Sequence, residues 1–346
     1  MKKYNIAIVG IRGAVGQEML KILKQRNFPF NEIRCFSTSL EQEKRIGEYL
    51  YEQLTEKNAT EKFNGVHIGL FSPGAEISKI FAPIAARTGC IVIDNTSAFR
   101  METDVPLVVP EVNPQDVQNH KGIIANPNCS TIQMVVALKP LHDYAKIKRI
   151  VVSTYQSVSG AGSAAIEEFE NQEKGNMTID AFPYQILRNL IPQIDIVQDN
   201  LYTKEEMKMV NETKKIMHDD TIRVTATCVR VPVLRAHSES VNIETEKKIT
   251  REKAVELLRR APGVIIIDDL LNKKYPMPLE AQDRDDIFVG RIREDESILN
   301  GLNLWVVSDN LRKGAALNAI QIAEELIKQG LVYTALSQDC EKEKAV

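Results

Sequence analysis

The sequence predicts an α/β protein of two domains, in which a parallel-sheet domain precedes a mixed-sheet α+β domain. The chain has 346 residues, a length typical of two domains. Its first third alternates short apolar strands with helices, which indicates a parallel sheet covered on both faces. After residue 129 strand-like runs outnumber helices, which favours a mixed or antiparallel sheet.

The expected elements follow the chain in order. In the first domain, apolar runs predict strands at 5–9, 32–36, 66–71, 90–94 and 123–125, and helical spacing predicts helices at 18–24 and 77–87. In the second domain, helices are expected at 131–141, 164–173, 204–215 and 251–260, and strands at 147–156, 221–233, 240–245, 264–267, 287–292 and 302–307. An amphipathic helix is expected at 310–327, followed by a polar tail at 337–346.

Composition excludes several classes of protein. The net charge is −3, whereas binding to nucleic acid or an anionic membrane needs concentrated positive charge. No apolar run reaches the length of a membrane span, and the N-terminus has no signal-peptide pattern. The five cysteines, at 35, 90, 129, 228 and 340, include no pair with metal-site spacing. We therefore expect a cytoplasmic protein with free thiols, no metal, no nucleic-acid partner and no membrane partner.

A glycine-rich loop directly follows the first expected strand and opens the first helix. It comprises Gly10, Arg12, Gly13, Ala14, Val15 and Gly16, in the spacing GxxGxxG. Glycines there permit a tight turn and bring a pyrophosphate close to the N–H groups of a helix N-terminus. This context favours a Rossmann-type nucleotide site, the alternative being an ordinary strand-to-helix turn.

The end of the second expected strand bears on the choice of cofactor. An NAD site usually has a carboxylate there for the ribose 2′-hydroxyl, but this chain has Ser37, Thr38 and Ser39. Three hydroxyls without a carboxylate suit a 2′-phosphate and predict NADP. A hydroxyl-rich turn of no functional importance is the alternative.

Cys129 is the candidate nucleophile, because it lies at or next to the start of an expected helix. The N–H groups and dipole of a helix N-terminus favour a thiolate and also an oxyanion. Cys35, Cys90 and Cys228 lie in apolar strands and are expected in the core, and Cys340 lies in the tail.

His237 is the candidate proton partner, because it lies in the dense segment Arg230-Val-Pro-Val-Leu-Arg-Ala-His237. Arginines near a histidine at a strand end can combine an anion-binding group with a base, although spacing alone fits a surface histidine equally well. Gln156 precedes a loop containing Gly160 and is a candidate to orient a polar substrate, the alternative being a plain strand-to-helix turn.

Taken together, the motifs resemble those of the aspartate-semialdehyde dehydrogenase family over nearly the whole chain. The matching segments are the glycine loop, Asp94-Asn-Thr-Ser-Ala-Phe-Arg100, Val109-Pro-Glu-Val-Asn113, Asn-Pro-Asn-Cys129-Ser-Thr, Gln156 with Ser-Gly-Ala-Gly, Glu205-Glu-Met-Lys208, Arg230 with His237, and Asp309-Asn310-Leu-Arg-Lys-Gly. The segment around Cys129 and the spacing of Arg230 to His237 are specific, whereas the glycine loop alone is not.

The resemblance implies a role for each candidate residue. Cys129 is the nucleophile, His237 the acid–base partner and Gln156 the residue that orients the acyl intermediate. The implied substrate contacts are Arg230 for the α-carboxylate, Arg100 and Lys208 for phosphate, and Glu205 for the ammonium, with Glu206 as a competing choice. The implied cofactor contacts, besides the glycine loop, are Thr38, Ser39, Ser159, Gly160 and Asn310.

The resemblance also implies the reaction and the architecture. The reaction is the NADPH-dependent reduction of L-aspartyl-4-phosphate to L-aspartate 4-semialdehyde through a cysteine thioester, a step of lysine, threonine, methionine and diaminopimelate biosynthesis. The fold is a pair of domains like those of glyceraldehyde-3-phosphate dehydrogenase. Residues 1–128 and 310–346 bind NADP, and residues 129–309 form a catalytic domain that assembles a homodimer or homotetramer.

Three alternatives stay open. Many family members have an Arg-Ser pair where this chain has Ser39-Leu40, so mixed use of NAD and NADP is compatible with the sequence. N-acetyl-glutamyl-phosphate reductase is the nearest rival enzyme, because it has a similar fold and chemistry. A catalytically silent nucleotide-binding protein of the same fold is the rival from another class.

Overall fold

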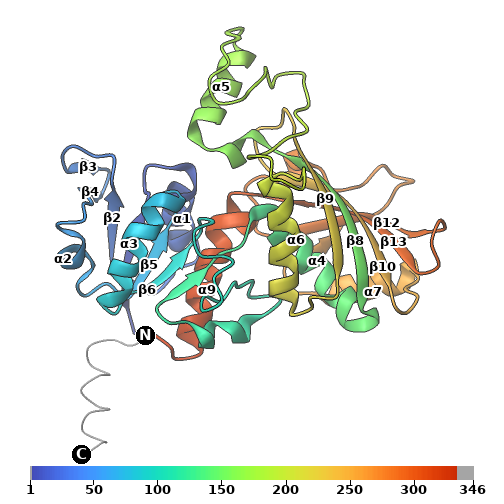
Figure 1. Cartoon of the computed structure of the whole chain (residues 1–346), viewed down its shortest axis with the longest axis horizontal. Helices are drawn as coiled ribbons and strands as arrows, with labels where there is room; N and C mark the ends of the chain where they lie inside the picture. Colours follow the sequence, from blue (N-terminus) through green and yellow to red (C-terminus); the bar gives the residue numbers. More distant parts are fainter. Residues whose placement is uncertain (1, 333–346) are drawn as a thin grey trace, which may run out of the picture. The chain divides into compact units, whose positions relative to one another are not determined.

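The structure is a computed structural model that describes residues 2–332 (Figure 1). The chain forms two compact units. The first unit comprises Met1–Pro127 and Ala316–Val346, and the second unit comprises Asn128–Ala315. Cys340 and the expected polar tail at 337–346 lie outside the described residues.

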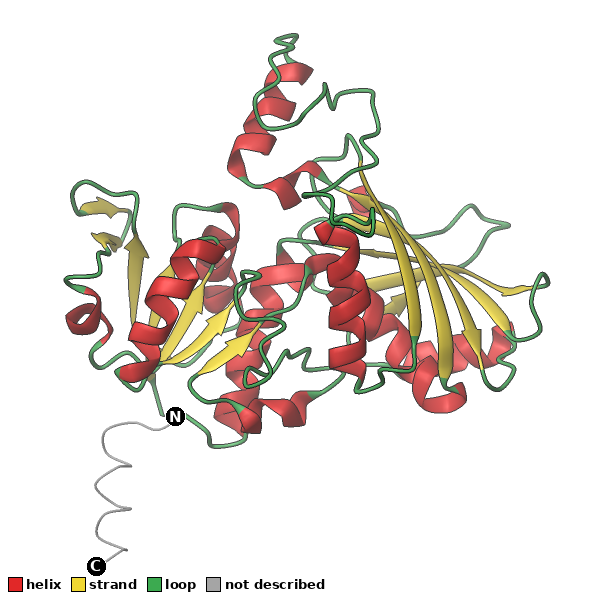
Figure 2. Cartoon of the chain, viewed as in Figure 1, coloured by secondary structure: helices red, strands yellow, loops and turns green. Residues whose placement is uncertain are grey.

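The first unit contains a seven-stranded sheet in the order β3-β4-β2-β1-β5-β6-β7 (Figure 2). Its strands are β1 (Tyr4–Val9), β2 (Phe30–Ser37), β3 (Lys44–Ile46), β4 (Tyr49–Gln53), β5 (Ile68–Phe71), β6 (Ile91–Asp94) and β7 (Ile123–Ala125). Every pairing is parallel except that of β3 with β4 at one edge. The predicted parallel sheet is thus confirmed, and β1 lies in its interior next to β2 and β5.

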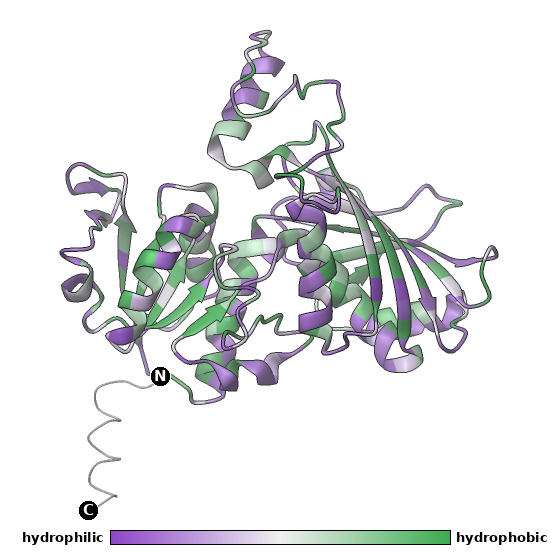
Figure 3. Cartoon of the chain, in the orientation of Figure 1, coloured by the Kyte–Doolittle hydropathy of each residue, from purple (hydrophilic) through white to green (hydrophobic). Residues whose placement is uncertain are grey.

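Helices cover both faces of this sheet. They are α1 (Ala14–Gln25), α2 (Ala59–Phe63), α3 (Ala75–Arg87), the 3-10 helix η1 (Pro114–Asn119) and α9 (Leu317–Lys328). One apolar core contains Met19 of α1 and Ile320 of α9, and the core on the opposite face contains Phe63 of α2 and Phe81 of α3. The inner strands β1, β5 and β6 are mostly apolar (Figure 3), as expected for strands buried on both faces.

The second unit contains a six-stranded mixed sheet in the order β11-β12-β13-β10-β8-β9, which confirms the predicted mixed sheet. Its strands are β8 (Ile147–Gln156), β9 (Arg223–Arg230), β10 (His237–Thr245), β11 (Val264–Ile266), β12 (Ile287–Asp295) and β13 (Gly301–Ser308). β8 pairs with β9 in parallel and with β10 antiparallel. Gln156 and Arg230 are register partners, so two candidate site residues end adjacent strands side by side.

The helices of the second unit include α4 (Cys129–Ala145), which packs across β8, β10, β12 and β13, and α6 (Lys204–Met217), which packs on β9 and α4. The others are the 3-10 helix η2 (Val158–Ala161), α5 (Ser163–Glu173), α7 (Arg251–Arg260) and α8 (Pro278–Ala281). A connection of residues 174–203 joins α5 to α6 without a helix or strand. None of the helices within residues 2–332 combines the length and the apolar character that a membrane span requires.

The predicted start of the helix expected at 310–327 is wrong. A π-helical turn, η3 (Arg312–Ala316), comes first, and α9 starts at Leu317. Asp309 accepts the N–H groups of Leu311 and Arg312 through its side chain, so the chain turns at Asp309 before it becomes α-helical. The amphipathic pattern did not predict this turn, because its charged residues Arg312 and Lys313 are buried together with the apolar ones.

Candidate active site

Cys129 is the first residue of α4, two positions before the expected start of this helix. The preceding residue, Asn128, is the N-cap, and its side-chain oxygen accepts the N–H groups of Ser130 and Thr131 at 3.0 and 3.3 Å. Asparagine is among the strongest N-cap residues because its short side chain satisfies these otherwise unpaired donors. The thiol therefore lies at the positive end of a well-capped helix.

His237 begins β10, and its Nε2 atom lies 3.2 Å from the Sγ atom of Cys129. The Nδ1 atom accepts the backbone N–H of Ser157 at 3.0 Å. Because an atom that accepts a hydrogen bond has no proton of its own, the neutral ring carries its proton on Nε2, facing the sulfur. Burial and the nearby charge of Arg230 lower the pKa of His237 to about 3, which keeps the ring neutral at ordinary pH.

Arg230 ends β9 and is 6% exposed. Its Nη1 atom donates to the backbone oxygen of Ser157 at 2.7 Å, so Ser157 connects the arginine to His237. Gly160 packs against both side chains: a Cβ atom there would lie 3.1 Å from Nη1 of Arg230 and 3.1 Å from Cε1 of His237. Only a residue without a side chain fits this position without displacing one of them.

Gln156, at the end of β8, connects the nucleophile's helix to α6. Its Nε2 atom donates to Oγ of Ser130 at 2.7 Å and to Oε1 of Glu205 at 3.1 Å. Burial by itself would raise the pKa of Glu205, but the charge of Lys208, 2.8 Å away, and hydrogen bonds from Lys208, Asn128 and Gln156 lower it to about 2. Glu205 is therefore a buried carboxylate, and Lys208 also pairs with Asp195 at 3.0 Å.

The structure distinguishes Glu205 from its neighbour Glu206. Glu206 accepts the backbone N–H of Thr203 at 2.7 Å with one oxygen and that of Cys228 at 3.1 Å with the other. Its own N–H donates to Oγ1 of Thr203, which completes a capping box at the start of α6. Both oxygens of Glu206 thus bind the backbone, whereas Glu205 faces the polar side chains around Cys129.

Asn310 joins another part of the site in the second unit. Its Oδ1 atom accepts the Oγ–H groups of Ser157 and Ser159 at 3.1 and 3.3 Å and the N–H of Ala236 at 3.0 Å. Nearby in the chain, Gly314 packs against the nucleophile, since a Cβ atom there would lie 2.9 Å from that of Cys129. The candidate residues of the second unit therefore form one connected group.

The other thiols and histidines have different environments. Cys35, Cys90 and Cys228 are buried, as predicted, and burial raises the pKa of each thiol, to about 12 for Cys35. Cys129 is partly exposed. The Nδ1 atoms of His67 and His142, like that of His237, accept a backbone N–H, but from Asn5 and Ile147, away from any described group of candidate residues.

The glycine loop, in the first unit, has the geometry that a dinucleotide requires. Gly10 has a φ of +87°, and a Cβ atom on Gly16 would lie 2.5 Å from the backbone oxygen of Gly10. Gly13 occupies the N-cap of α1 and has no side chain to cover the N–H groups of Ala14 and Val15. The loop therefore leaves the helix start accessible to a pyrophosphate, which fits the expected cofactor.

The hydroxyl cluster after β2 is joined to the glycine loop. Nη1 of Arg12 donates to Oγ of Ser39 at 2.9 Å and to its backbone oxygen at 3.1 Å, and Ser37 and Ser39 are in hydrogen-bond contact. Thr38 lies between these serines. A guanidinium beside hydroxyls is a chemically suitable partner for a phosphate.

Arg100 also lies in the first unit and is 8% exposed. Its guanidinium donates to the backbone oxygens of Asn126 and Asn95, both at 3.0 Å. Within residues 2–332, no group of three His, Cys, Asp or Glu side chains is arranged to hold a metal ion.

Sequence reasoning missed several polar residues of this site, namely Asn128, Ser130, Ser157 and Glu212. Asn128 was detectable, because asparagine directly before a helix is an N-cap signal. Glu212 was not, because its carboxylate accepts the N–H of Asn128, 84 positions away in the chain.

The fold and the cysteine–histidine pair define a nucleotide-dependent enzyme that acts on an acyl or aldehyde carbon. Comparison with known families agrees: residues 5–120 match the semialdehyde dehydrogenase NAD binding domain, and residues 138–313 match the semialdehyde dehydrogenase dimerisation domain. The chain therefore contains an NAD-binding domain and is a semialdehyde dehydrogenase by class.

Curated and solved relatives narrow this class. The chain is 54% identical to the aspartate-semialdehyde dehydrogenase of Aquifex aeolicus and 50% identical to that of Bacillus subtilis, each over 95% of this chain and 99% of the relative. A crystal structure of aspartate semialdehyde dehydrogenase II from Vibrio cholerae, complexed with ASA, aligns with a TM-score of 0.89 at 46% identity, over 95% of this chain and 99% of that one. The chain belongs to the aspartate-semialdehyde dehydrogenase family.

Proposed function

We propose that this chain reduces L-aspartyl-4-phosphate to L-aspartate 4-semialdehyde with NADPH and releases phosphate. The observation that carries the proposal is the 3.2 Å contact between Sγ of Cys129 and Nε2 of a buried, neutral His237 at a capped helix start. The proposal assigns most cofactor contacts to the first unit, and it assigns catalysis, oligomerisation and the remaining cofactor contacts to the second.

Cys129 performs the first chemical step. Its sulfur attacks the acyl-phosphate carbon, the S–C bond forms, and the C–O bond to phosphate breaks, leaving a thioester on Cys129. The Nε2–H of His237 points at the sulfur and favours the thiolate. Arg100 and Lys208 are the cations assigned to the departing phosphate.

His237 and Gln156 serve the second step. NADPH, when bound, supplies the hydride that reduces the thioester carbon. The Nε2–H of His237 then donates a hydrogen bond to the oxygen anion that reduction leaves on the carbon. This anion collapses to the aldehyde as the S–C bond breaks, and the sulfur of Cys129 leaves as a thiolate. Gln156, held between Ser130 and Glu205, orients the acyl group.

Two charged groups hold the amino-acid part of the substrate. Arg230 is assigned to the α-carboxylate, because a planar guanidinium binds a carboxylate with two parallel hydrogen bonds. Glu205 is assigned to the ammonium, because it is a buried carboxylate, whereas both oxygens of Glu206 bind the backbone.

The cofactor assignment is NADP. The pyrophosphate is assigned to the glycine loop, and the 2′-phosphate to Arg12, Thr38 and Ser39. Arg12 supplies the positive charge that the Arg-Ser pair provides in many family members and that Ser39-Leu40 lacks. Ser159, Gly160 and Asn310 complete the assigned cofactor contacts.

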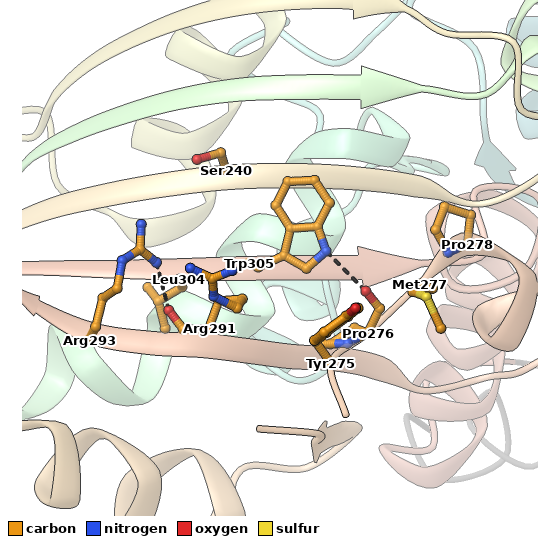
Figure 4. Close-up of a pocket in the computed structure, with 9 residues that line it drawn as sticks. All are labelled: Ser240, Tyr275, Pro276, Met277, Pro278, Arg291, Arg293, Leu304 and Trp305. Atoms are coloured by element: carbon orange, nitrogen blue, oxygen red, sulfur yellow. Dashed lines mark hydrogen bonds between the residues drawn. The ribbon is translucent and has the colours of Figure 1, made fainter. Parts of the chain in front are cut away.

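The assembly assigned to the chain is a homodimer, with a homotetramer as the larger alternative. The residues that match the dimerisation domain include one face of the second sheet. A pocket on this face is lined by Tyr275, Met277 and Trp305, and Trp305 donates a hydrogen bond to the backbone oxygen of Pro276 (Figure 4). The 174–203 connection adds exposed apolar side chains such as Leu201, at 85%. A second copy of the chain is the assigned occupant of both surfaces. The three buried, unpaired thiols favour a cytoplasmic location.

The first test is phosphate- and semialdehyde-dependent reduction of NADP by the wild-type chain and by Cys129→Ala. The wild type should be active, and Cys129→Ala should lose at least about 10³-fold in kcat because the covalent step is removed. A Cys129→Ala protein that retains this activity would contradict the mechanism.

Arg230→Leu tests the substrate assignment. We expect it to impair use of the semialdehyde far more than binding of NADPH, measured by fluorescence titration. A parallel assay with N-acetyl-glutamate semialdehyde should give much lower kcat/KM, because that substrate has no free ammonium for Glu205. Preference for the acetylated substrate would instead favour the reductase of N-acetyl-glutamyl phosphate.

A further inference from the structure

Asn128, the residue before the nucleophile, uses its backbone N–H and both polar atoms of its side chain in hydrogen bonds. Its backbone N–H donates to Oε2 of Glu212 at 2.6 Å, and its side-chain Nδ2 donates to Oε1 of Glu205 at 2.9 Å. Its side-chain oxygen caps α4 through Ser130 and Thr131. Asn128 therefore ties the first turn of α4 to two positions of α6.

A single stripe of α6 makes these contacts. Glu205, Met209 and Glu212 are spaced i, i+4 and i+7, which places them on one face of a helix. Met209 belongs to the same contact, because its sulfur accepts the hydroxyl of Thr131 at 3.6 Å. Figure 1 shows α4 and α6 as neighbours, and their packing agrees with this stripe.

The carboxylate of Glu212 lowers the folding stability because it is buried, so its presence indicates a specific role. Glu212 is 1% exposed, and burying a carboxylate carries a large desolvation cost that water or a backbone oxygen in its place would avoid. Its hydrogen bond to the N–H of Asn128 is short and fixes the backbone one residue before Cys129.

We propose that Glu212 is a positioning residue of the reaction, which holds the backbone of Asn128 and thereby aims the sulfur of Cys129 at His237 and at the substrate. This inference rests on the proposed function. The helix α6 then has two tasks: its first turn supplies the assigned substrate contacts Glu205 and Lys208, and its third turn sets the nucleophile. One rigid helix thus fixes the distance between the substrate ammonium and the attacking sulfur.

The experiment compares Glu212→Leu with Glu212→Gln. We expect Glu212→Leu to lower kcat by about 100-fold with KM for the semialdehyde within about threefold, since a misplacement of about 1 Å costs this much. Glu212→Gln retains an oxygen that accepts the same N–H, so kcat should return to within about fivefold of the wild type. Glu212→Asp, which shortens the side chain by one methylene, should lie between these two and serves if Glu212→Leu does not fold.

Glu206→Leu is the matched control. It removes a buried carboxylate from the same helix and breaks hydrogen bonds to the N–H groups of Thr203 and Cys228. It should lower the melting temperature but leave kcat within about threefold, because its partners are not attached to the first turn of α4.

Two outcomes would overturn the proposal: a wild-type kcat in folded Glu212→Leu or Glu212→Asp, or a kcat in Glu212→Gln as low as in Glu212→Leu. Alkylation of Cys129 by iodoacetamide, measured in the same variants, separates this proposal from the proposed function. A wild-type chain that does not reduce NADP contradicts the proposed function alone. Slower alkylation in Glu212→Leu, restored in Glu212→Gln, supports the positioning role by itself, and equal rates in all variants overturn it.

Discussion

The Nε2 atom of His237 lies 3.2 Å from the Sγ atom of Cys129, and the opposite nitrogen of the ring is occupied by a backbone N–H. The neutral ring therefore has a single N–H group, on Nε2, and this group faces the sulfur. A doubly protonated ring would place two N–H groups against each other at Ser157, so the environment favours the neutral form.

The first prediction concerns acid stability. The pKa of His237 is about 3 in the folded chain, below its ordinary value of about 6.5, because of burial and the charge of Arg230. Between these values the unfolded chain binds a proton that the folded chain does not, so stability is lost as the pH falls from about 6.5 towards 3, by up to about 1.4 kcal/mol per pH unit. His237→Gln should therefore lose less stability between pH 7 and pH 5 in urea unfolding. Equal pH dependence in both proteins would refute this.

The second prediction concerns thiol reactivity. In a Cys340→Ser background at pH 8, iodoacetamide should modify Cys129 first, because burial raises the pKa of Cys35, Cys90 and Cys228. Peptide mass spectrometry should find the first equivalent of label on Cys129. An activity assay of the same sample should show that activity is lost at this one equivalent. Cys129→Ala in the same background should take up label only after unfolding, and rapid labelling of the folded variant would count against the prediction.

The third prediction concerns the choice of cofactor. Ser39→Asp places a carboxylate beside Arg12, where it would neutralise the guanidinium and repel a 2′-phosphate. KM for NADP should rise by about 10- to 100-fold, while KM for NAD should stay within about threefold. Ser39→Asn, a neutral control of similar size, should have a much smaller effect. A parallel rise for both cofactors would show that the change disturbs the fold of the loop instead.

The fourth prediction concerns Gly160. Gly160→Ala adds a Cβ atom about 3.1 Å from Arg230 and His237, close enough to displace either side chain by a few tenths of an ångström. We expect kcat/KM for the semialdehyde to fall by about 10-fold or more, with little change in melting temperature. Gly175→Ala, at a glycine with φ +93° and open space around its Cβ position, is a control expected to change stability more than activity. Unchanged kcat/KM in Gly160→Ala would contradict the tight packing.

The sequence predicted what depends on local patterns. The bounds expected for the strand at 147–156 and the helix at 251–260 match β8 and α7, because their apolar periodicity is strong. β3 and β4 were not expected, since β3 (Lys44–Ile46) is short, exposed and charged, and pairing stabilises it only in the folded sheet.

The parts of the site that could not be predicted depend on long-range contacts. Glu205 and Glu206 are equivalent in the sequence, and only the folded backbone of Thr203 and Cys228 distinguishes them. The link from Glu212 to Asn128 likewise needs two helices packed together. Local signals therefore identify the nucleophile, whereas its supports become visible only in three dimensions.

The close approach of Gly314 to Cys129 has a consequence for redesign of the enzyme. A Cβ atom at position 314 would lie 2.9 Å from the Cβ atom of Cys129, so a side chain there cannot be added without moving the residue that bears the nucleophile. Redesign for a longer or branched substrate should therefore leave position 314 as glycine and vary residues that are not packed against Cys129.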